Sequence, residues 1–182
     1  YPEAEASARR SVALSPRDAI YRANLGDLLL REGKTREALE TTRAAVMLDS
    51  TNAENWYNLG VSLASSDSLP QAIGAYRRAI AINPGHFQAI NNLGASLASS
   101  GRMQEARDAY AKAVEVQPMS VEARMNLALA SLHLGDTQTA SAQRAVIEKL
   151  DPASAQQLLQ AIKQIEAAKG GPPQGRPPTI RR

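Results

Sequence analysis

The sequence predicts an all-α solenoid built from helix-turn-helix repeats of one fixed length. Four asparagines, each followed by Leu and a small residue, stand 34 residues apart, at Asn24, Asn58, Asn92 and Asn126. A fixed period of roughly 20–50 residues is the signature of a repeat array. Apolar residues follow helical spacing between these marks, Gly, Pro and polar cap residues separate the segments, and no stretch has the pattern of a strand.

The chain is expected to begin with a single helix over residues 1–16. Ala8 and Val12 belong to its apolar stripe. Pro2 suits the first turn of a helix, where its missing N–H costs nothing, and Pro16 follows the end. We interpret this segment as the second helix of an incomplete repeat.

Four complete helix-turn-helix units are expected over residues 17–52, 53–86, 87–120 and 121–152. Their first helices should start after Asp18, Asn52, His86 and Ser120. All of these except the histidine carry a short side-chain oxygen that can accept a free backbone N–H. The same helices should end near Gly33, Asp67, Gly101 and Gly135, because glycine allows the left-handed conformation that closes a helix.

Small residues recur within each unit. Glycine stands in the middle of three first helices, at Gly26, Gly60 and Gly94. Mid-helix glycine costs about 1 kcal/mol relative to alanine, so its repetition indicates a repeated close approach to the partner helix. The surface expected to oppose it is an alanine column in the second helices, at Ala38, Ala72, Ala106 and Ala140.

The second unit carries the fullest motif, with Trp56, Leu59, Gly60, Leu63, Ala72, Tyr76, Ala79 and Pro84. This pattern resembles the tetratricopeptide repeat, whose period is 34 residues, although Leu63 and Tyr76 stand where that family prefers Tyr and Phe. The resemblance covers residues 1 to about 169. It implies a right-handed superhelical solenoid whose concave groove is lined by the first helices, with Trp56 in the core.

After the repeats we expect one more helix over residues 153–169. Leu158 and Ile162 lie on its apolar stripe, and a solvating helix of this kind can cover the last hydrophobic face of an array. Residues 170–182 are rich in Pro, Gly and Arg and are expected to be a disordered tail. A Pro-Arg ligand for an SH3-like domain is the alternative for this tail.

Composition excludes several classes of protein. The 21 basic residues exceed the 18 acidic ones only through Arg176, Arg181 and Arg182, which all lie in the tail. The body is therefore formally neutral and has no basic face for nucleic acid. No apolar run is long enough for membrane insertion. The compartment stays open, with the cytoplasm favoured over a bacterial periplasm.

No arrangement of residues points to catalysis, a cofactor or a metal. His86 and His133 are far apart, with no Cys in the chain and no carboxylates at ligand spacing. There is no Gly-rich phosphate loop. We therefore expect a protein that is not an enzyme and that uses neither a cofactor nor a metal.

The candidate ligand-binding residues share one face of each first helix, because residues three, four and seven apart lie on the same side. An Asn side chain there has both a donor and an acceptor, so it can pair with the N–H and C=O of a ligand backbone. The alternative is that these asparagines bond within the array. The candidates are Asn24, Asp27, Arg31, Glu54, Tyr57, Asn58, Val61, Gln88, Asn91, Asn92, Met125, Asn126, Leu129 and His133.

A resemblance to known repeat proteins implies which ligands this face could bind. The asparagine column is similar to the ladder in the repeat arm of O-linked N-acetylglucosamine transferases, which holds acceptor polypeptide. The resemblance extends only to that arm, because these 182 residues contain no glycosyltransferase domain. The carboxylate clamp of chaperone-binding relatives needs Lys and Arg beside the asparagines, and only Arg31 is basic there. Tyr57, Asn91, Met125 and Leu129 are expected to form shallow pockets.

We therefore expect a non-catalytic protein-protein interaction scaffold. Its concave groove would bind an extended or short helical peptide segment of a partner protein. Two alternatives stay open. The chain could be the substrate-recruiting arm of a larger enzyme such as a glycosyltransferase, or a structural module that forms homo-oligomers through its open N-terminal helix.

Overall fold

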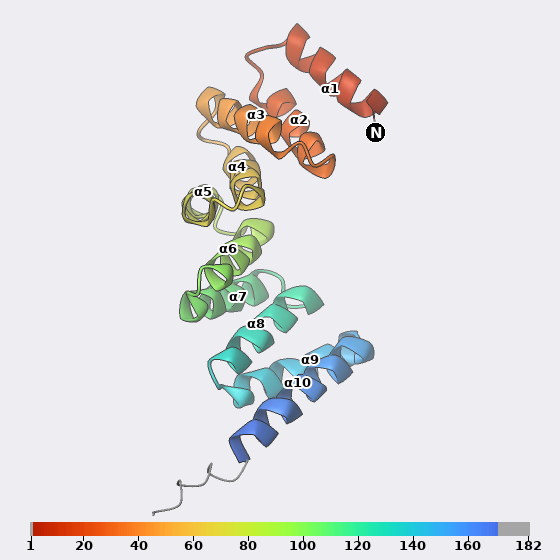
Figure 1. Cartoon of the computed structure of the whole chain (residues 1–182), viewed down its shortest axis with the longest axis vertical. Coiled ribbons are helices and arrows are strands. Elements are labelled where there is room, and N and C mark those ends of the chain that lie inside the picture. Colours follow the sequence, from red (N-terminus) through yellow and green to blue (C-terminus); the bar gives the residue numbers. More distant parts are fainter. Residues whose placement is uncertain (1, 171–182) are drawn as a thin grey trace, which may run out of the picture.

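The computed structural model describes residues 2–170, and within that range the chain forms ten α-helices and no strand. Consecutive helices pack against one another, so the molecule is an elongated stack of helix pairs (Figure 1). The helices are α1 (Pro2–Leu14), α2 (Ala19–Arg31), α3 (Thr35–Leu48), α4 (Ala53–Ser65), α5 (Leu69–Ile82), α6 (Phe87–Ser99), α7 (Met103–Val116), α8 (Val121–His133), α9 (Thr137–Leu150) and α10 (Pro152–Gly170).

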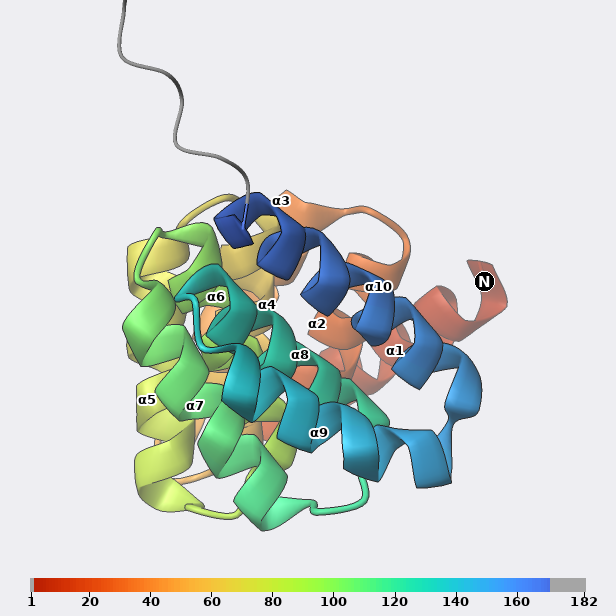
Figure 2. The same ribbon diagram turned by 90° about the horizontal axis from the view of Figure 1, so that it is seen from below.

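The stack twists into a superhelix. Seen along its long axis, α3, α5, α7 and α9 lie around the outside, whereas α2, α4, α6 and α8 lie towards the middle (Figure 2). From α3 to α9 the outer helices turn counter-clockwise as the chain approaches the viewer, which is the right-handed sense. The predicted all-α, right-handed superhelical solenoid is therefore confirmed.

The first helices of the pairs begin at side-chain caps. In α2, α4 and α8 the cap oxygen accepts a free backbone N–H at 2.8 to 3.2 Å, from Asp18, Asn52 and Ser120. His86 caps α6 as well, because its Nδ1 accepts from the N–H of Ala89 at 3.3 Å. The N-cap preferences of amino acids did not predict this role for His86, because they favour short side chains with an oxygen atom. An imidazole nitrogen without a proton can also accept a hydrogen bond.

Each of these helices closes in the left-handed conformation. The residues with positive φ are Gly33 at 75°, Asp67 at 56°, Gly101 at 74° and Gly135 at 83°. Asp67 is the single non-glycine residue of this kind in the part of the chain that the structure describes. Asp tolerates this conformation better than most residues, because its short polar side chain can bond locally.

The mid-helix glycines face side chains of the second helix. A Cβ added to Gly60 would lie 2.5 Å from Cε1 of Tyr76, and one added to Gly94 would lie 2.7 Å from Cε1 of Tyr110. The expected opposing surface was therefore wrong. The alanines, Ala72 among them, are fully buried, but the ring four residues further along the same helix fills the space beside the glycine.

Trp56 lies at the edge of the core and is only partly buried. Its Nε1 donates to the carbonyl oxygen of Ser50 at 2.9 Å. The guanidinium of Arg78 lies over the ring, 5.5 Å from its centroid. The indole thus joins the second unit to the turn before it.

Both ends of the stack are covered by one further helix. Ala8 and Val12 of α1 pack against the cluster around Leu29, between α2 and α3. Leu158 and Ile162 of α10 lie in the last core cluster, with residues of α8 and α9. Of the expected tail, residues 171–182 lie outside the described residues.

Candidate functional site

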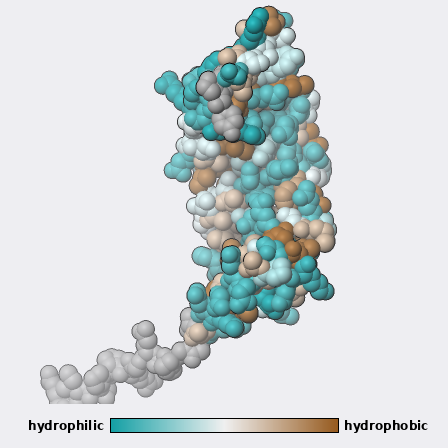
Figure 3. Space-filling view, turned by 90° about the vertical axis from the view of Figure 1, so that its right-hand side faces the viewer, coloured by the Kyte–Doolittle hydropathy of each residue, from teal (hydrophilic) through white to brown (hydrophobic). Residues whose placement is uncertain are grey.

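The candidate groove is the concave side of the stack, formed by α2, α4, α6 and α8. These inner helices face the side on which the superhelix is open, to the right in Figure 2. Figure 3 shows that side of the molecule. Its middle is largely hydrophilic, and hydrophobic patches lie towards its lower end, at the height of α8 (Figure 3). The groove therefore changes in character along its length.

Seven of the predicted residues surround one hollow at the N-terminal end of the groove. It has a volume of about 300 Å³, and we call it the polar hollow. Side chains from three successive first helices meet there because the repeats stack in register. The lining residues are Asn24, Asp27, Arg31, Glu54, Tyr57, Asn58 and Gln88.

Charge in the polar hollow is only partly paired. Arg31 and Asp27 form an ion pair at 2.9 Å on the surface of α2. Glu54 has a different partner, because its Oε2 lies 3.2 Å from Nε2 of the buried His86. Nδ1 of this histidine accepts a backbone N–H, so Nε2 is the ring nitrogen that donates to the carboxylate. His86 thus orients the Glu54 carboxylate.

Tyr57 forms one wall of the polar hollow and is held there by two other rings. Its ring centroid lies 5.0 Å from that of His86 and 6.2 Å from that of Tyr76. Burial raises the pKa of Tyr57, and the negative charges of Glu54 and Asp27 raise it further, against a hydrogen bond from Asn92. The phenol is therefore a neutral hydrogen-bonding group at physiological pH.

The asparagine column divides into two halves. Asn24 is exposed, Asn58 is half-buried, and both line the polar hollow. No side-chain hydrogen bond of either is found among residues 2–170. Asn92 instead lies close enough to Tyr57 and Tyr76 to act on the pKa of both phenols, which it lowers. Asn24 and Asn58 therefore fit the interpretation in which the asparagine side chains bind a ligand.

Asn126 and Asn91 fit the alternative, in which the amides bond within the array. Asn126 Nδ2 donates to Oδ1 of Asn91 at 3.1 Å, and Asn91 Nδ2 donates to Oε1 of Glu122 at 2.7 Å. Asn91 is only 5% exposed. The expectation that Asn91 forms part of a shallow pocket is therefore wrong, because its amide is buried between α6 and α8.

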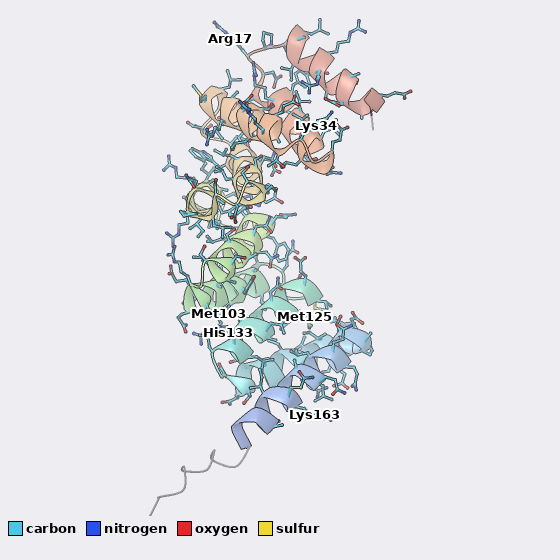
Figure 4. All side chains as sticks on the ribbon, viewed as in Figure 1. Arg17, Lys34, Met103, Met125, His133 and Lys163 are labelled. Atoms are coloured by element: carbon cyan, nitrogen blue, oxygen red, sulfur yellow. The ribbon has the colours of Figure 1, made fainter. Side chains whose placement is uncertain are left out.

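A second hollow, of about 320 Å³, lies at the C-terminal end of the groove, and we call it the apolar hollow. Leu129 stands there with 46% of its surface exposed. Met103 and His133 lie at one end of α8, whereas Met125 lies at the other (Figure 4). The lining residues are Ala98, Met103, Tyr110, Asn126, Leu129, Ala130 and His133.

Four of these residues were not predicted from the sequence, namely Ala98, Met103, Tyr110 and Ala130. The sequence prediction covered one face of the first helices alone. Met103 and Tyr110 come from α7, a second helix. A signal existed for the tyrosine, which stands one period after Tyr76 in the motif. The remaining candidates, Val61 and Met125, are half-buried and pack against the core clusters.

Among residues 2–170 there is no group of three or more His, Asp or Glu side chains placed to hold a metal ion. Within the same range, none of the helices has the length and apolar character needed to cross a membrane.

Comparisons with known proteins agree on the fold. A family model described as tetratricopeptide repeat matches residues 1–55, 25–87 and 91–155. Among curated proteins there is no significant match. A crystal structure of MamA protein is similar to this chain at 26% identity and a TM-score of 0.72, covering 84% of this chain and 83% of that one.

Two further solved structures have the same fold at lower identity. YrrB, described as a TPR protein with an unusual peptide-binding site, is 20% identical with a TM-score of 0.71, covering 86% of this chain and 81% of that one. The first TPR of Spaghetti (RPAP3), bound to the HSP90 peptide SRMEEVD, is 22% identical with a TM-score of 0.63. That match covers 65% of this chain and 94% of the other.

Proposed function

The chain belongs to the tetratricopeptide repeat family, and from that premise we propose that it is a non-catalytic interaction scaffold whose concave groove binds a peptide segment of a partner protein. One observation carries the proposal. Asn24 and Asn58 line the polar hollow with side-chain amides that make no hydrogen bond within the described chain. An amide group offers a donor and an acceptor together, which is what one peptide unit of a ligand needs.

The spacing of the helices favours an extended ligand. Neighbouring packed helices lie roughly 8–10 Å apart. An extended chain advances about 3.3 Å per residue. One Asn on each first helix would therefore meet about every third residue of the ligand. The groove is already formed by the packing of the repeats, so the ligand bears most of the ordering cost.

Two of the similar structures support the same kind of partner. YrrB is described with a peptide-binding site, and the first TPR of Spaghetti is bound to a peptide. Their identity to this chain is low, so they support the class of ligand and say nothing of its sequence.

The test is a selection of binders from a random dodecapeptide display library against the full chain. Selected peptides are then titrated against Asn24→Ala/Asn58→Ala and against a control, Gln71→Ala/Gln138→Ala. The control removes two exposed amides from the outer helices α5 and α9. Loss of the two groove amides should weaken binding about thirtyfold, since two net hydrogen bonds of roughly 1 kcal/mol each contribute about 2 kcal/mol.

The control variant should bind like the unmodified chain, and circular dichroism should show the same helix content in all three proteins. Equal affinity of the Asn24→Ala/Asn58→Ala variant would place the ligand away from these amides and contradict the proposed role of the groove. A selection that yields no binder would contradict the peptide-binding function itself.

A further inference from the structure

Resting on the function proposed above, we infer that the ligand is a cationic extended segment of a partner protein. A Lys or Arg side chain of this segment meets the polar hollow. A bulky aliphatic or aromatic side chain, roughly six residues away, enters the apolar hollow. The arguments are the charge of the groove, the hydrogen bonds that fix its carboxylates, and the distance between the two hollows.

The groove has unpaired negative charge. On its faces of α2, α4, α6 and α8, the charged side chains are Asp27, Arg31, Glu54 and Glu122. Asp27 and Arg31 neutralise each other at 2.9 Å. The two glutamates remain, because neither is paired with a Lys or Arg side chain within the described chain; their partners are His86 and Asn91. A ligand that supplies positive charge therefore complements the groove, whereas an acidic ligand is repelled.

Both glutamates are held in place from behind. Buried His86 lies 3.2 Å from Glu54 Oε2, and buried Asn91 donates to Glu122 Oε1 at 2.7 Å. Each of these bonds fixes one carboxylate oxygen and leaves the other available to the groove. Buried polar side chains that hold exposed carboxylates in one orientation are typical of a preorganised binding site.

The carboxylates converge on the same part of the groove. The charges of Glu54, Asp27 and Glu122 all act to raise the pKa of Tyr57, and that of Glu122 also raises the pKa of Tyr110. Tyr57 lines the polar hollow and Tyr110 lines the apolar hollow. Hydrogen bonds also connect Glu122 to the apolar hollow, because Asn91 bonds both to its carboxylate and to Asn126, which lines that hollow.

The apolar hollow fits an uncharged anchor. Leu129 is 46% exposed beside a space of about 320 Å³ whose walls include Met103 and Tyr110. An exposed leucine next to a hollow with apolar walls gains most from a ligand side chain that removes it from water. Methionine adapts its shape to such a side chain, which suits more than one apolar residue.

The distance between the hollows sets the spacing in the ligand. Glu54 lies on α4 and Leu129 on α8, two first helices further along the stack. Two steps of roughly 10 Å between packed helices give about 20 Å. An extended chain covers that distance in roughly six residues.

The test uses the same dodecapeptide selection and analyses the sequences of the binders. Peptides whose binding depends on Asn24 and Asn58 should be enriched in Lys or Arg, with an apolar residue roughly six positions away. Replacing that Lys or Arg by Glu in a synthetic copy of the strongest binder should abolish binding. Binding of the original peptide should also weaken as salt is raised, because ions screen exposed charges.

Protein variants test the same point. Glu54→Gln/Glu122→Gln should weaken the cationic peptide about tenfold. The control Glu40→Gln removes an exposed carboxylate of the outer helix α3 and should change nothing. Groove-dependent binders that are neutral or acidic, or that ignore Glu54 and Glu122, would overturn this inference and leave the proposed function standing. A failure to select any binder would instead overturn the function.

Discussion

Single glycines decide how closely the two helices of a repeat approach. A Cβ at Gly60 would lie 2.5 to 2.6 Å from ring carbons of Tyr76, which is 1% exposed and has no free space to enter. Overpacking of a core costs about 1–3 kcal/mol. The gain in helix propensity offsets about 1 kcal/mol of this. Gly60→Ala should therefore lower the free energy of unfolding by up to about 2 kcal/mol, measured by urea denaturation.

The same chain contains a matched control for that substitution. Gly74 lies inside α5, and no atom is within 4 Å of the place a Cβ would take. Gly74→Ala should raise the free energy of unfolding by up to about 1 kcal/mol, because only the helix propensity changes. If both substitutions stabilised the protein, the close contact of Gly60 with Tyr76 would not limit the packing.

Ser131 is a destabilising residue in the core of the fourth repeat. The earlier repeats have Leu29, Leu63 and Leu97 at this place. The Ser131 side chain is fully buried, and its hydroxyl has no hydrogen-bond partner. A buried polar group left unsatisfied costs about 1–3 kcal/mol. Ser131→Ala should therefore raise the free energy of unfolding by about 1 kcal/mol.

Ser62→Ala is the comparison for Ser131. The Ser62 hydroxyl is equally buried but donates to the carbonyl of Asn58 at 3.0 Å and accepts from Thr42 at 3.1 Å. Its loss should destabilise the protein by about 1 kcal/mol. Thermal or urea unfolding that moved in the same direction for both serines would show that hydrogen bonding does not explain the difference.

At the scale of the helix, α1 is attached to the array by an ionic network. Glu5 bonds to Lys34 and Arg9, and Arg9 bonds on to Glu37 at 2.6 Å. Lys34, followed by Arg9, lowers the pKa of Glu5 from 4.5 to about 2. A carboxylate with a lowered folded-state pKa stabilises above its unfolded-state pKa, and that contribution is lost as the pH falls.

Acid should therefore loosen α1. As the pH falls from 4.5 to about 2, the stabilisation that Glu5 gives to the folded state is lost, and amide exchange within residues 3–14 should accelerate relative to that of α4. Hydrogen-exchange mass spectrometry on peptides from both helices measures this. Glu5→Gln lacks the titrating group, so its α1 should exchange faster already at pH 6 and should change less on acidification. Identical pH profiles for the two proteins would exclude the network as the attachment.

Helix positions were predictable because their signals are local. Asn52 caps the helix that starts after it, and Gly101 and Gly135 close helices in a conformation that few other residues adopt. Because the units repeat every 34 residues, the helix ends found in one unit predicted those in the others. Contacts between helices were less predictable. The residue that faces Gly60 depends on how α4 and α5 cross, and sequence spacing alone pointed to Ala72 instead of Tyr76.

The same limit applies to the groove. Helical spacing selected the face that carries Asn24 and Asn58 and the other residues of the polar hollow. It could not show that Asn91 is buried, or that His86 orients Glu54 from the next repeat. These are contacts between repeats, and the twist of the superhelix decides which side chains meet. The nearly one-period spacing of Glu54 and His86 was the available signal.

At the scale of the whole molecule, the free energy of unfolding is approximately the sum of the stabilities of the single repeats and of the interfaces between neighbouring repeats. Each repeat contacts only the adjacent ones, so a stack behaves like a one-dimensional array. The largest fully buried side chains include Tyr76 and Leu97 in the middle of the chain, whereas α1 has no buried side chain among its described residues. The ends have a neighbour on one side only and should open more easily than the middle.

Native-state hydrogen exchange should therefore show a gradient, with slowest exchange in α4 to α7 and fastest in α1 and the end of α10.

Ile162→Asp places a charge at a site in α10 that is 4% exposed, within the cluster shared with α8 and α9. Because coupling passes only between neighbours, this change should accelerate exchange about tenfold or more in α8 to α10 and leave α2 to α4 nearly unchanged. Uniform acceleration along the chain would mean that the array unfolds as one cooperative unit. A ligand that spans both hollows should then slow exchange in α4 and α8 together, since it binds only while both ends of the groove are folded.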